Sequence, residues 1–418
     1  MPASPGAPIR YACVTCGKTF ESAGVVYRCP DCARRPEDAH GFPTGCLSVV
    51  YAPPGGKRMD KGGAADIESF LPLPMSRRSA FPAGATPLIA PEALRKRTGF
   101  ANLWLKNDAA SLSGSLKDRA SALVAEQALA AGEDRVVLAS TGNAGASMAC
   151  AGAACGLRVI LFVPAAAPRA KLLQSLLYGA RVVPVQGTYD EAFSLSIAYT
   201  ERFGGINRNT AYNPLTVEGK KTVSLEIYNQ LGCRVPDSVY VPTGDGVIFS
   251  GACKGFADLK TAGLADRVPE MNVVQAEGSN AIVQSARSGR QTVIASARTI
   301  ADSLSVRRPA AGSMALRFLS ETGGRAVQVT DVAIQAAQAE LAHSAGLFVE
   351  PSSAAAWAGF LQDRQNLDPR STVVVLLTGT GFKDVAAAES LVSLPPSCPS
   401  ELESATRFLS EHYHIQQG

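Results

Sequence analysis

The chain has 418 residues, of which 46% are hydrophobic and 18% are charged, a balance typical of globular proteins and not of disordered ones. Its 40 Lys and Arg residues exceed its 36 Asp and Glu residues by four, which is too small an excess to indicate nucleic acid or an anionic membrane as the main partner. The sequence predicts no membrane span, and its first ten residues do not resemble a secretory signal. We therefore expect a cytoplasmic protein, whose length favours two or more domains.

Four of the ten cysteines form two C-x-x-C pairs near the N-terminus, Cys13 with Cys16 and Cys29 with Cys32. Two such pairs can place four thiolates around one zinc ion, and a closed four-cysteine site leaves no open coordination position. The pattern predicts a structural zinc ribbon in residues 1–50, a segment too short to have a core of its own. A metal used for recruitment or catalysis, and a pair of disulfides, are the alternatives.

Residues 48–90 are rich in Gly, Pro and Ser, and we expect a linker there with at most one short helix. Strands and helices then alternate, which is typical of parallel sheets covered by helices. The first sheet is expected to contain strands at 103–106, 136–139, 159–163 and 182–185. Its helices are expected at 115–129, at 168–178 and, rich in Ala, between the turn 140–143 and Gly156. A second sheet is expected from strands at 239–241, 273–276, 326–329 and 373–377, with helices at 248–259, 331–345 and 353–362.

This order predicts an α/β fold with two open parallel-sheet domains and a small N-terminal zinc ribbon. We expect a small mobile domain at 108–205 and a large domain formed by 51–107 and 206–395. The tail, 396–418, is expected to contain one amphipathic helix at 401–413.

The chain has only four histidines, and none follows a predicted strand, so the candidates for catalysis are lysines, hydroxyl groups and backbone amides. Lys117 lies just inside the start of a predicted helix, in the segment SLSGSLKDRA. The positive end of the helix dipole and the neighbouring Arg119 both favour a neutral amine, the form that reacts with an aldehyde. An ordinary solvated lysine in the first helical turn is the alternative.

Two glycine turns, at 140–143 and 243–246, each follow a predicted strand and precede a helix. Backbone amides and the helix dipole bind anions at such positions, so we expect one carboxylate site and one phosphate site. Thr378 also follows a strand, at the end of the sheet where ligands of open α/β folds bind. An amine, a hydroxyl group and two anion sites together fit pyridoxal phosphate.

With these motifs in place, the sequence resembles the threonine synthases, pyridoxal phosphate enzymes of the tryptophan-synthase-beta type. The resemblance extends from the cysteine pairs to about residue 390, through eight segments in the family's order: GSLKDRAS, STGNAGAS, FVPAAAPRAKLLQSLLYGARVV, NRNTAYNPLTVEGKKT, PTGDGVIFSGACKGF, TIADSLSV, GLFVEPSSAAAWAG and LLTGTGFKD. It implies the fold type II architecture, a homodimer, and conversion of O-phosphohomoserine and water into threonine and phosphate.

The resemblance also implies roles for individual residues. Lys117 would bind the cofactor covalently and move protons at the substrate carbons. The other cofactor contacts would come from Asn143, Thr243, Gly244, Asp245, Gly246 and Thr378. The carboxylate of an amino-acid substrate would be bound by Ser140, Thr141 and Gly142.

The expected substrate-phosphate site departs from the family pattern, because Thr216 stands where many members have an Arg. The candidate replacements are Arg208, Lys220 and Lys171, and a solvated surface role is the alternative for each. A related enzyme that performs β-replacement or deamination on phosphoserine, serine or threonine is therefore an alternative function. A non-catalytic binding protein that carries a ribbon is a second one.

Overall fold

The computed structural model describes residues 8–35, 38, 41–52 and 60–415. The chain divides into two compact units, Met1–Asp384 and Val385–Gly418. The second unit contains the helices α12 (Val385–Glu389) and α13 (Leu402–Tyr413), and α13 corresponds to the helix expected at 401–413. This unit begins before residue 396, where the sequence analysis begins the tail.

The larger sheet of the first unit has six strands in the order β12-β11-β10-β13-β5-β4. All neighbours pair in parallel except β4 and β5, which are antiparallel. The strands are β4 (Leu88–Ile89), β5 (Leu103–Asn107), β10 (Ser238–Pro242), β11 (Glu270–Ala276), β12 (Ala326–Val329) and β13 (Val373–Leu377). The predicted α/β class is confirmed. Two details differ from the expectation: β5, expected in the sheet with 136–139, 159–163 and 182–185, lies in this one, and β4 is an antiparallel edge strand that was not predicted.

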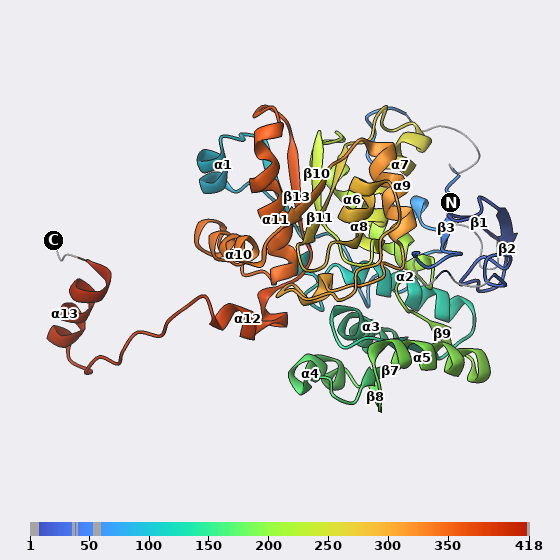
Figure 1. Ribbon diagram of the computed structural model, residues 1–418, viewed down its shortest axis with the longest axis horizontal. Coiled ribbons are helices and arrows are strands. Elements are labelled where there is room, and N and C mark those ends of the chain that lie inside the picture. The colour runs from blue at the N-terminus through green and yellow to red at the C-terminus, as the bar shows by residue number, and fades with distance from the viewer. Residues whose placement is uncertain (1–7, 36–37, 39–40, 53–59, 416–418) are drawn as a thin grey trace. The chain divides into compact units, whose positions relative to one another are not determined.

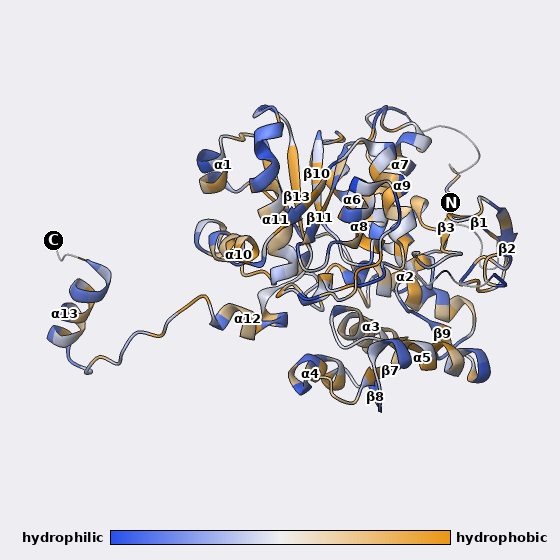
Figure 2. Cartoon of the chain, in the orientation of Figure 1, coloured by the Kyte–Doolittle hydropathy of each residue, from blue (hydrophilic) through white to orange (hydrophobic). Residues whose placement is uncertain are grey.

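Helices cover both faces of this sheet (Figure 1). One face packs against α6 (Leu215–Gln230), α7 (Val247–Ala262), α8 (Ala281–Ser288) and α9 (Gly312–Thr322), and the other against α1 (Glu92–Thr98), α10 (Asp331–Ala345) and α11 (Pro351–Asp363). Strand β13 shows why its sequence is apolar throughout: Val374 and Leu376 enter the first core, whereas Val375 and Leu377 enter the second. Figure 2 accordingly shows β13 in orange.

The second sheet has four parallel strands in the order β8-β7-β6-β9. The strands are β6 (Arg135–Ala139), β7 (Arg158–Pro164), β8 (Arg181–Val185) and β9 (Ile206–Asn207). The helices α2 (Lys117–Ala130) and α3 (Asn143–Cys155) share a core with one face, and α5 (Tyr189–Phe203) with the other, while α4 (Arg169–Leu177) packs on α3. Strand β9 belongs to this sheet although it lies after residue 205, and the division into small and large domains stays a prediction.

The N-terminal segment forms a three-stranded antiparallel sheet in the order β2-β1-β3. Its strands are β1 (Ile9–Cys13), β2 (Thr19–Ser22) and β3 (Leu47–Val49). In the described part of the linker, one 3₁₀ turn lies at Ile67–Phe70, before β4 begins. Among the described residues, no helix has both the length and the apolar character needed to cross a membrane.

Helix α6 is held between α2 and α7 by contacts that only glycine allows. A Cβ atom at Gly219 would lie 2.3 Å from the carbonyl oxygen of Arg119 on α2. A Cβ atom at Gly251 on α7 would lie 2.8 Å from the Cβ of Lys220. Because real Cβ atoms do not approach so closely, these two glycines fix the spacing of the three helices.

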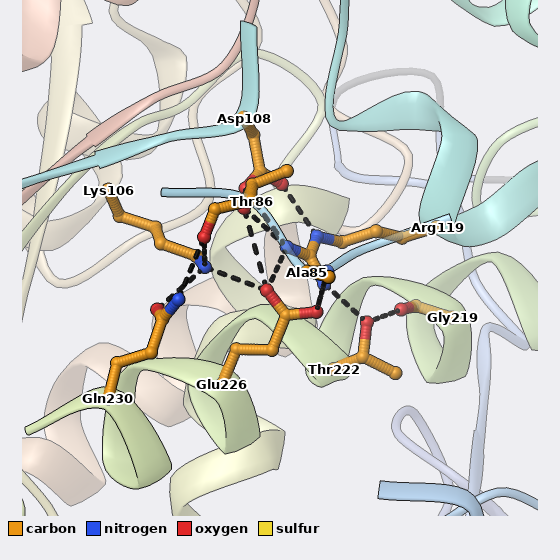
Figure 3. A network of polar contacts seen from close by, with 9 residues as sticks. All are labelled: Ala85, Thr86, Lys106, Asp108, Arg119, Gly219, Thr222, Glu226 and Gln230. Carbon is orange, nitrogen blue, oxygen red and sulfur yellow. Dashed lines mark hydrogen bonds and ion pairs between the residues drawn. The ribbon is translucent and has the colours of Figure 1, made fainter. Parts of the chain in front are cut away.

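A buried ion network joins α2 and α6 to β5 and to Asp108, which follows it (Figure 3). The Arg119 guanidinium donates from Nε to Asp108 Oδ2 at 2.6 Å and from Nη2 to Glu226 Oε2 at 2.7 Å. Lys106 Nζ donates to the same Glu226 oxygen, also at 2.7 Å. A buried carboxylate with two cationic partners has its charge compensated, so the network fixes the position of α2, on which Lys117 lies, relative to α6.

Candidate active site

Three of the predicted ligand-binding segments follow strands, at the carboxyl ends of those strands. The segment 140–143 connects β6 to α3, the segment 243–246 connects β10 to α7, and Thr378 follows β13 directly. These local placements agree with the sequence analysis. The roles proposed for the individual residues rest on the geometry that follows.

Lys117 is the first residue of α2, and its side chain is half-buried. Burial lowers the pKa of the Lys117 amine, an effect that the charges of Asp245 and Glu350 oppose and that of Arg208 supports. The sequence argument named Arg119 as the neighbouring cation, but that guanidinium is engaged by carboxylates in the buried network. A lysine with a lowered pKa is suited to covalent chemistry and to proton transfer near neutral pH.

Two further cations lie close to Lys117. Arg208 follows β9 and is fully buried; its Nη1 donates to Thr210 Oγ1 at 2.8 Å, while its Nε has no hydrogen-bond partner among the described residues. Burial lowers the pKa of Arg208 to about 10. Lys220 on α6 is also fully buried, and Lys117, Arg208 and Asp245 all act on its charge. The structure thus brings Lys117, Arg208 and Lys220 into one group.

Asn143, the first residue of α3, donates from Nδ2 to both carboxylate oxygens of Glu350, at 3.1 and 3.0 Å. Its Nδ2 also lies 3.4 Å from Ser303 Oγ. Burial raises the pKa of Glu350, and the Asn143 hydrogen bond and the charge of Lys117 oppose that rise. The sequence analysis did not identify Glu350, whose only local signal is the following Pro351 at the start of α11.

Thr378 is buried and lies beside Ser353 of α11, with the two hydroxyl oxygens 3.3 Å apart. The Ser353 hydroxyl accepts hydrogen bonds from the Thr378 and Gly379 amides, at 2.9 and 2.7 Å, and donates to the Gly379 carbonyl. This fixes the backbone after β13, so the direction of the Thr378 side chain is determined by two elements. The sequence analysis named Thr378 but not Ser353.

The turn from Thr243 to Gly246 packs tightly against neighbouring backbone. A Cβ at Gly244 would lie 2.9 Å from the Ser303 carbonyl oxygen, and Gly246 has a φ of 90°, which favours glycine. The Asp245 Oδ1 accepts a hydrogen bond from the Val247 amide at 3.0 Å. The turn therefore brings the Asp245 carboxylate to the amino end of α7, next to the first amides of that helix.

The turn before α3 lines a cleft. Ser140 Oγ accepts hydrogen bonds from the Gly142 and Gly145 amides, at 3.3 and 3.0 Å, and fixes the turn. The cleft is lined by Thr141, Gly142, Asn143, Lys171, Gln174, Asp302, Ser303, Glu350 and Lys383, among others. Lys171 forms an ion pair with Asp302 at 2.9 Å, and its side chain is 30% exposed, unlike those of the buried cations.

The four predicted cysteine ligands come together beside the N-terminal sheet, where Cys13 ends β1 and the other three lie outside its strands. Their sulfur atoms all lie within 4.8 Å of one another, and the pairs Cys13–Cys32 and Cys16–Cys29 are 3.7 Å apart. All four are free thiols, so the alternative of two disulfides does not describe this structure. The backbone amide of Lys18 lowers the pKa of Cys16 to about 7. The arrangement is one that could hold a metal ion.

The sequence and the fold were compared with those of known proteins. A family model described as "Pyridoxal-phosphate dependent enzyme" matches residues 80–379. The curated threonine synthase of Methanosarcina acetivorans is 33% identical over 384 residues, which cover 89% of this chain and 91% of that protein. The threonine synthase of Methanocaldococcus jannaschii is 32% identical over 413 residues, which cover 96% of this chain and 99% of that protein.

Solved structures share the fold at lower sequence identity. Threonine deaminase isoform 2 from Solanum lycopersicum has a TM-score of 0.65 at 20% identity, covering 88% of this chain and 95% of that chain. Maize serine racemase has a TM-score of 0.63 at 21% identity, covering 84% of this chain and 100% of that chain. The resemblance inferred from eight sequence segments is confirmed: the chain belongs to the threonine synthases, within the family of pyridoxal-phosphate dependent enzymes.

Proposed function

We propose that this protein is a threonine synthase that uses pyridoxal phosphate to convert O-phosphohomoserine and water into threonine and phosphate. The observation that carries the proposal is the position of Lys117, at the start of α2 in one group with Asp245, Arg208 and Glu350. Curated relatives named threonine synthase cover nearly the whole chain, which favours this substrate over those of the more distant structural neighbours.

The residues present fit the cofactor group by group. Lys117 offers an amine for the aldehyde, Asn143 an amide for the phenolic oxygen, and Thr378 a hydroxyl group for the ring nitrogen. Thr243, Gly244, Asp245 and Gly246 form the turn that opens α7, where backbone amides suit the phosphate. The buried Lys220 Nζ and Arg208 Nε lack hydrogen-bond partners in the described part of the chain, which is expected of a site that receives an anion.

Each residue then has a defined task. When bound, the cofactor supplies an electron sink for negative charge at the α carbon of the substrate. Lys117, whose lowered pKa favours the neutral amine, accepts the α proton and delivers protons at the later steps. Thr378 cannot hold a ring nitrogen protonated as a carboxylate would, which favours elimination and replacement over transamination.

The substrate is bound at its two charged ends. Ser140, Thr141 and Gly142 offer the amino end of α3 to the carboxylate, next to Asn143. For the substrate phosphate, Arg208 supplies a buried cation near Lys117, and Lys171 supplies one at the cleft opening. These two residues take the place of the arginine that many family members carry at the position of Thr216.

The remaining features are proposals of the same kind. The four cysteines would bind a structural Zn²⁺, since their sulfur atoms lie within 4.8 Å of one another and a closed four-thiolate site leaves no position for substrate. We also propose a homodimer in the cytoplasm, as the resemblance to the family implies. Light scattering of the purified protein measures the first of these two properties, and cell fractionation measures the second.

The function is tested by incubating the cofactor-loaded protein with O-phosphohomoserine and measuring phosphate and threonine. We expect both products in equal amounts. O-phosphoserine, serine and threonine are tested in parallel, with pyruvate or 2-ketobutyrate as the deamination products. Turnover of one of these without turnover of O-phosphohomoserine would replace the proposal by the β-replacing or deaminating alternative. A protein that binds the cofactor and turns over none of them would support the non-catalytic alternative.

A further inference from the structure

Helix α6 carries two adjacent lysines that are both fully buried but differ in their partners. Lys221 Nζ forms ion pairs with Glu218 at 2.6 Å and with Asp258 at 2.8 Å. Lys220 Nζ has no hydrogen-bond partner among the described residues. Burying an unpaired ammonium is very costly, so the chain must either keep this amine neutral or provide a charge for it.

The groups that face Lys220 come from three other elements. Lys117 lies at the start of α2, Arg208 follows β9, and Asp245 lies in the turn before α7. Burial and the charge of Lys117 lower the pKa of Lys220 well below its ordinary value; Asp245 opposes this and Arg208 adds to it. Lys117 and Arg208 thus oppose a charge on Lys220, Asp245 favours it, and burial together with the two cations favours the neutral amine in the protein alone.

The contact between α6 and α7 places the Cβ atom of Lys220 against Gly251 of α7. A Cβ at Gly251, within the first turns of α7, would lie 2.8 Å from the Lys220 Cβ. Asp245, which acts on the Lys220 charge, directly precedes the amino end of the same helix. Lys220 is therefore beside the helix end where the free amides and the dipole favour a phosphate group.

We propose that Lys220 binds the phosphate group of the cofactor and accepts a proton from solvent when that phosphate binds. The inference rests on the proposed function for the identity of the cofactor. A phosphate dianion balances the excess of basic groups around Asp245, and the new ammonium can then donate charge-assisted hydrogen bonds to the phosphate oxygens. The glycine turn supplies backbone amides to the phosphate, and Lys220 supplies the charge that amides lack.

The competing assignment for Lys220 is the phosphate of the substrate. A substrate enters from solvent, and the cleft is lined by Lys171 and Asp302, whereas neither Lys220 nor the equally buried Arg208 lines it. Lys220 instead contacts the packed interior between α6 and α7. Contact with α7, whose amino end carries the glycine turn, suits Lys220 to the cofactor phosphate. Arg208 follows β9 and makes no such contact, so it remains with Lys171 for the phosphate that enters and leaves.

The test compares two aldehydes that differ only in the phosphate, pyridoxal phosphate and pyridoxal. The cofactor-free protein is titrated with each, and binding is measured from absorbance and fluorescence. Lys220→Met removes the charge at nearly constant length, and Lys220→Gln retains a hydrogen-bond donor in case the first variant folds poorly. We expect both to weaken pyridoxal phosphate binding by about 10- to 100-fold, the usual effect of losing a charge-assisted bond. Pyridoxal binding should change by less than about threefold, since no phosphate contact is lost.

The pH dependence of cofactor affinity tests whether Lys220 takes up a proton when the phosphate binds. Above the second pKa of a phosphate ester, about 6, the affinity ratio of pyridoxal phosphate to pyridoxal should fall as the pH rises, because the complex needs a proton that the free protein does not hold. Dividing the two affinities removes the pH dependence of the covalent step at Lys117, which both aldehydes share. In Lys220→Met the ratio should not change with pH in this range.

Lys221→Met provides a matched control, since it removes a buried lysine from the same helix. We expect it to lower the stability of the fold through loss of the Glu218 and Asp258 ion pairs, and to leave the affinity ratio unchanged. An unchanged ratio in both Lys220 variants would overturn the inference. A raised Michaelis constant for O-phosphohomoserine with unchanged cofactor affinity would assign Lys220 to the substrate instead. If the unaltered chain bound neither aldehyde, the proposed function itself would fail.

Discussion

Arg119 of α2 and Glu226 of α6 form a buried ion pair, with Nη2 and Oε2 2.7 Å apart. Arg119 lies two residues after Lys117, and Glu226 lies on the same helix as Lys220. The pair, together with the close contact at Gly219, holds the two amines of the candidate active site at a fixed spacing. It is thus a positioning element for a site in which neither residue takes part chemically.

Glu226→Gln should destabilise the fold by about 3–5 kcal/mol, because it leaves the buried cations Arg119 and Lys106 without their shared carboxylate. The midpoint of chemical denaturation measures the effect. Glu68→Gln is the control, because the ion pair of Glu68 with Arg78 is exposed and should contribute less than about 1 kcal/mol. Equal effects of the two substitutions would contradict a special role for the buried network.

The loss of stability caused by Glu226→Gln should depend on pH. Burial alone would raise the pKa of Glu226, but the charges of Arg119 and Lys106 outweigh it and lower the pKa to about 2. A carboxyl group with a depressed pKa stabilises the fold fully above its ordinary value of 4.5 and loses that contribution as the pH falls towards 2. The difference in unfolding free energy between the unaltered chain and Glu226→Gln should therefore shrink over this interval.

Lys117→Ala should abolish covalent attachment of the cofactor and all turnover, since no other amine occupies the start of α2. Borohydride reduction followed by mass spectrometry measures the attachment, and phosphate release measures the turnover. Lys96→Ala, on the exposed side of α1, should change neither. Turnover above trace level in Lys117→Ala would refute the assignment of the catalytic amine.

Arg208→Ala should raise the Michaelis constant for O-phosphohomoserine far more than that for a substrate without a phosphate, such as threonine in a deamination assay. The expected difference is about tenfold or more, because an unpaired phosphate in a closed pocket is costly. Equal loss with both substrates would indicate an effect on folding or on the cofactor. If only Lys171→Ala had the selective effect, the phosphate would be bound at the cleft opening.

Cys13→Ser and Cys29→Ser should release the metal and loosen the N-terminal sheet, while cofactor absorbance is largely retained. Metal content is measured by atomic emission, and cofactor binding by absorbance. The cofactor residues lie on other elements, so a purely structural ribbon has no direct effect on the chemistry. Loss of turnover from a variant that remains folded and cofactor-loaded would contradict a structural role.

The sequence predicted the parts of the site that follow strands, because strand ends and glycine turns have local signals. Asn143 and Thr378 are such residues, whereas Lys117 was identified at the start of a predicted helix. Glu350 was missed because its partner Asn143 is 207 residues away, and no periodicity records a contact of that range. Ser353 was missed for the same reason: its hydroxyl group acts on the backbone of another element.

Helix α6 was not predicted although it carries Lys220 and Glu226. It is buried on nearly all sides, so it has no polar face and no apolar stripe to indicate a period of 3.6 residues. For Lys220, a solvated surface role was the alternative to binding the substrate phosphate. The polar side chains of α6 are explained by ion pairs with α2, α7 and β5, which only the folded chain reveals.

The glycine contacts of α6 also bear on how the gene can be recombined. Since Gly219 and Gly251 allow backbone to meet backbone, α2, α6 and α7 fit one another as a set. A chimera whose crossover falls between Lys117 and Ala262 would join helices whose contact surfaces were selected in different proteins. Crossovers outside this interval would transfer the three helices together, and with them the charges that surround Lys117.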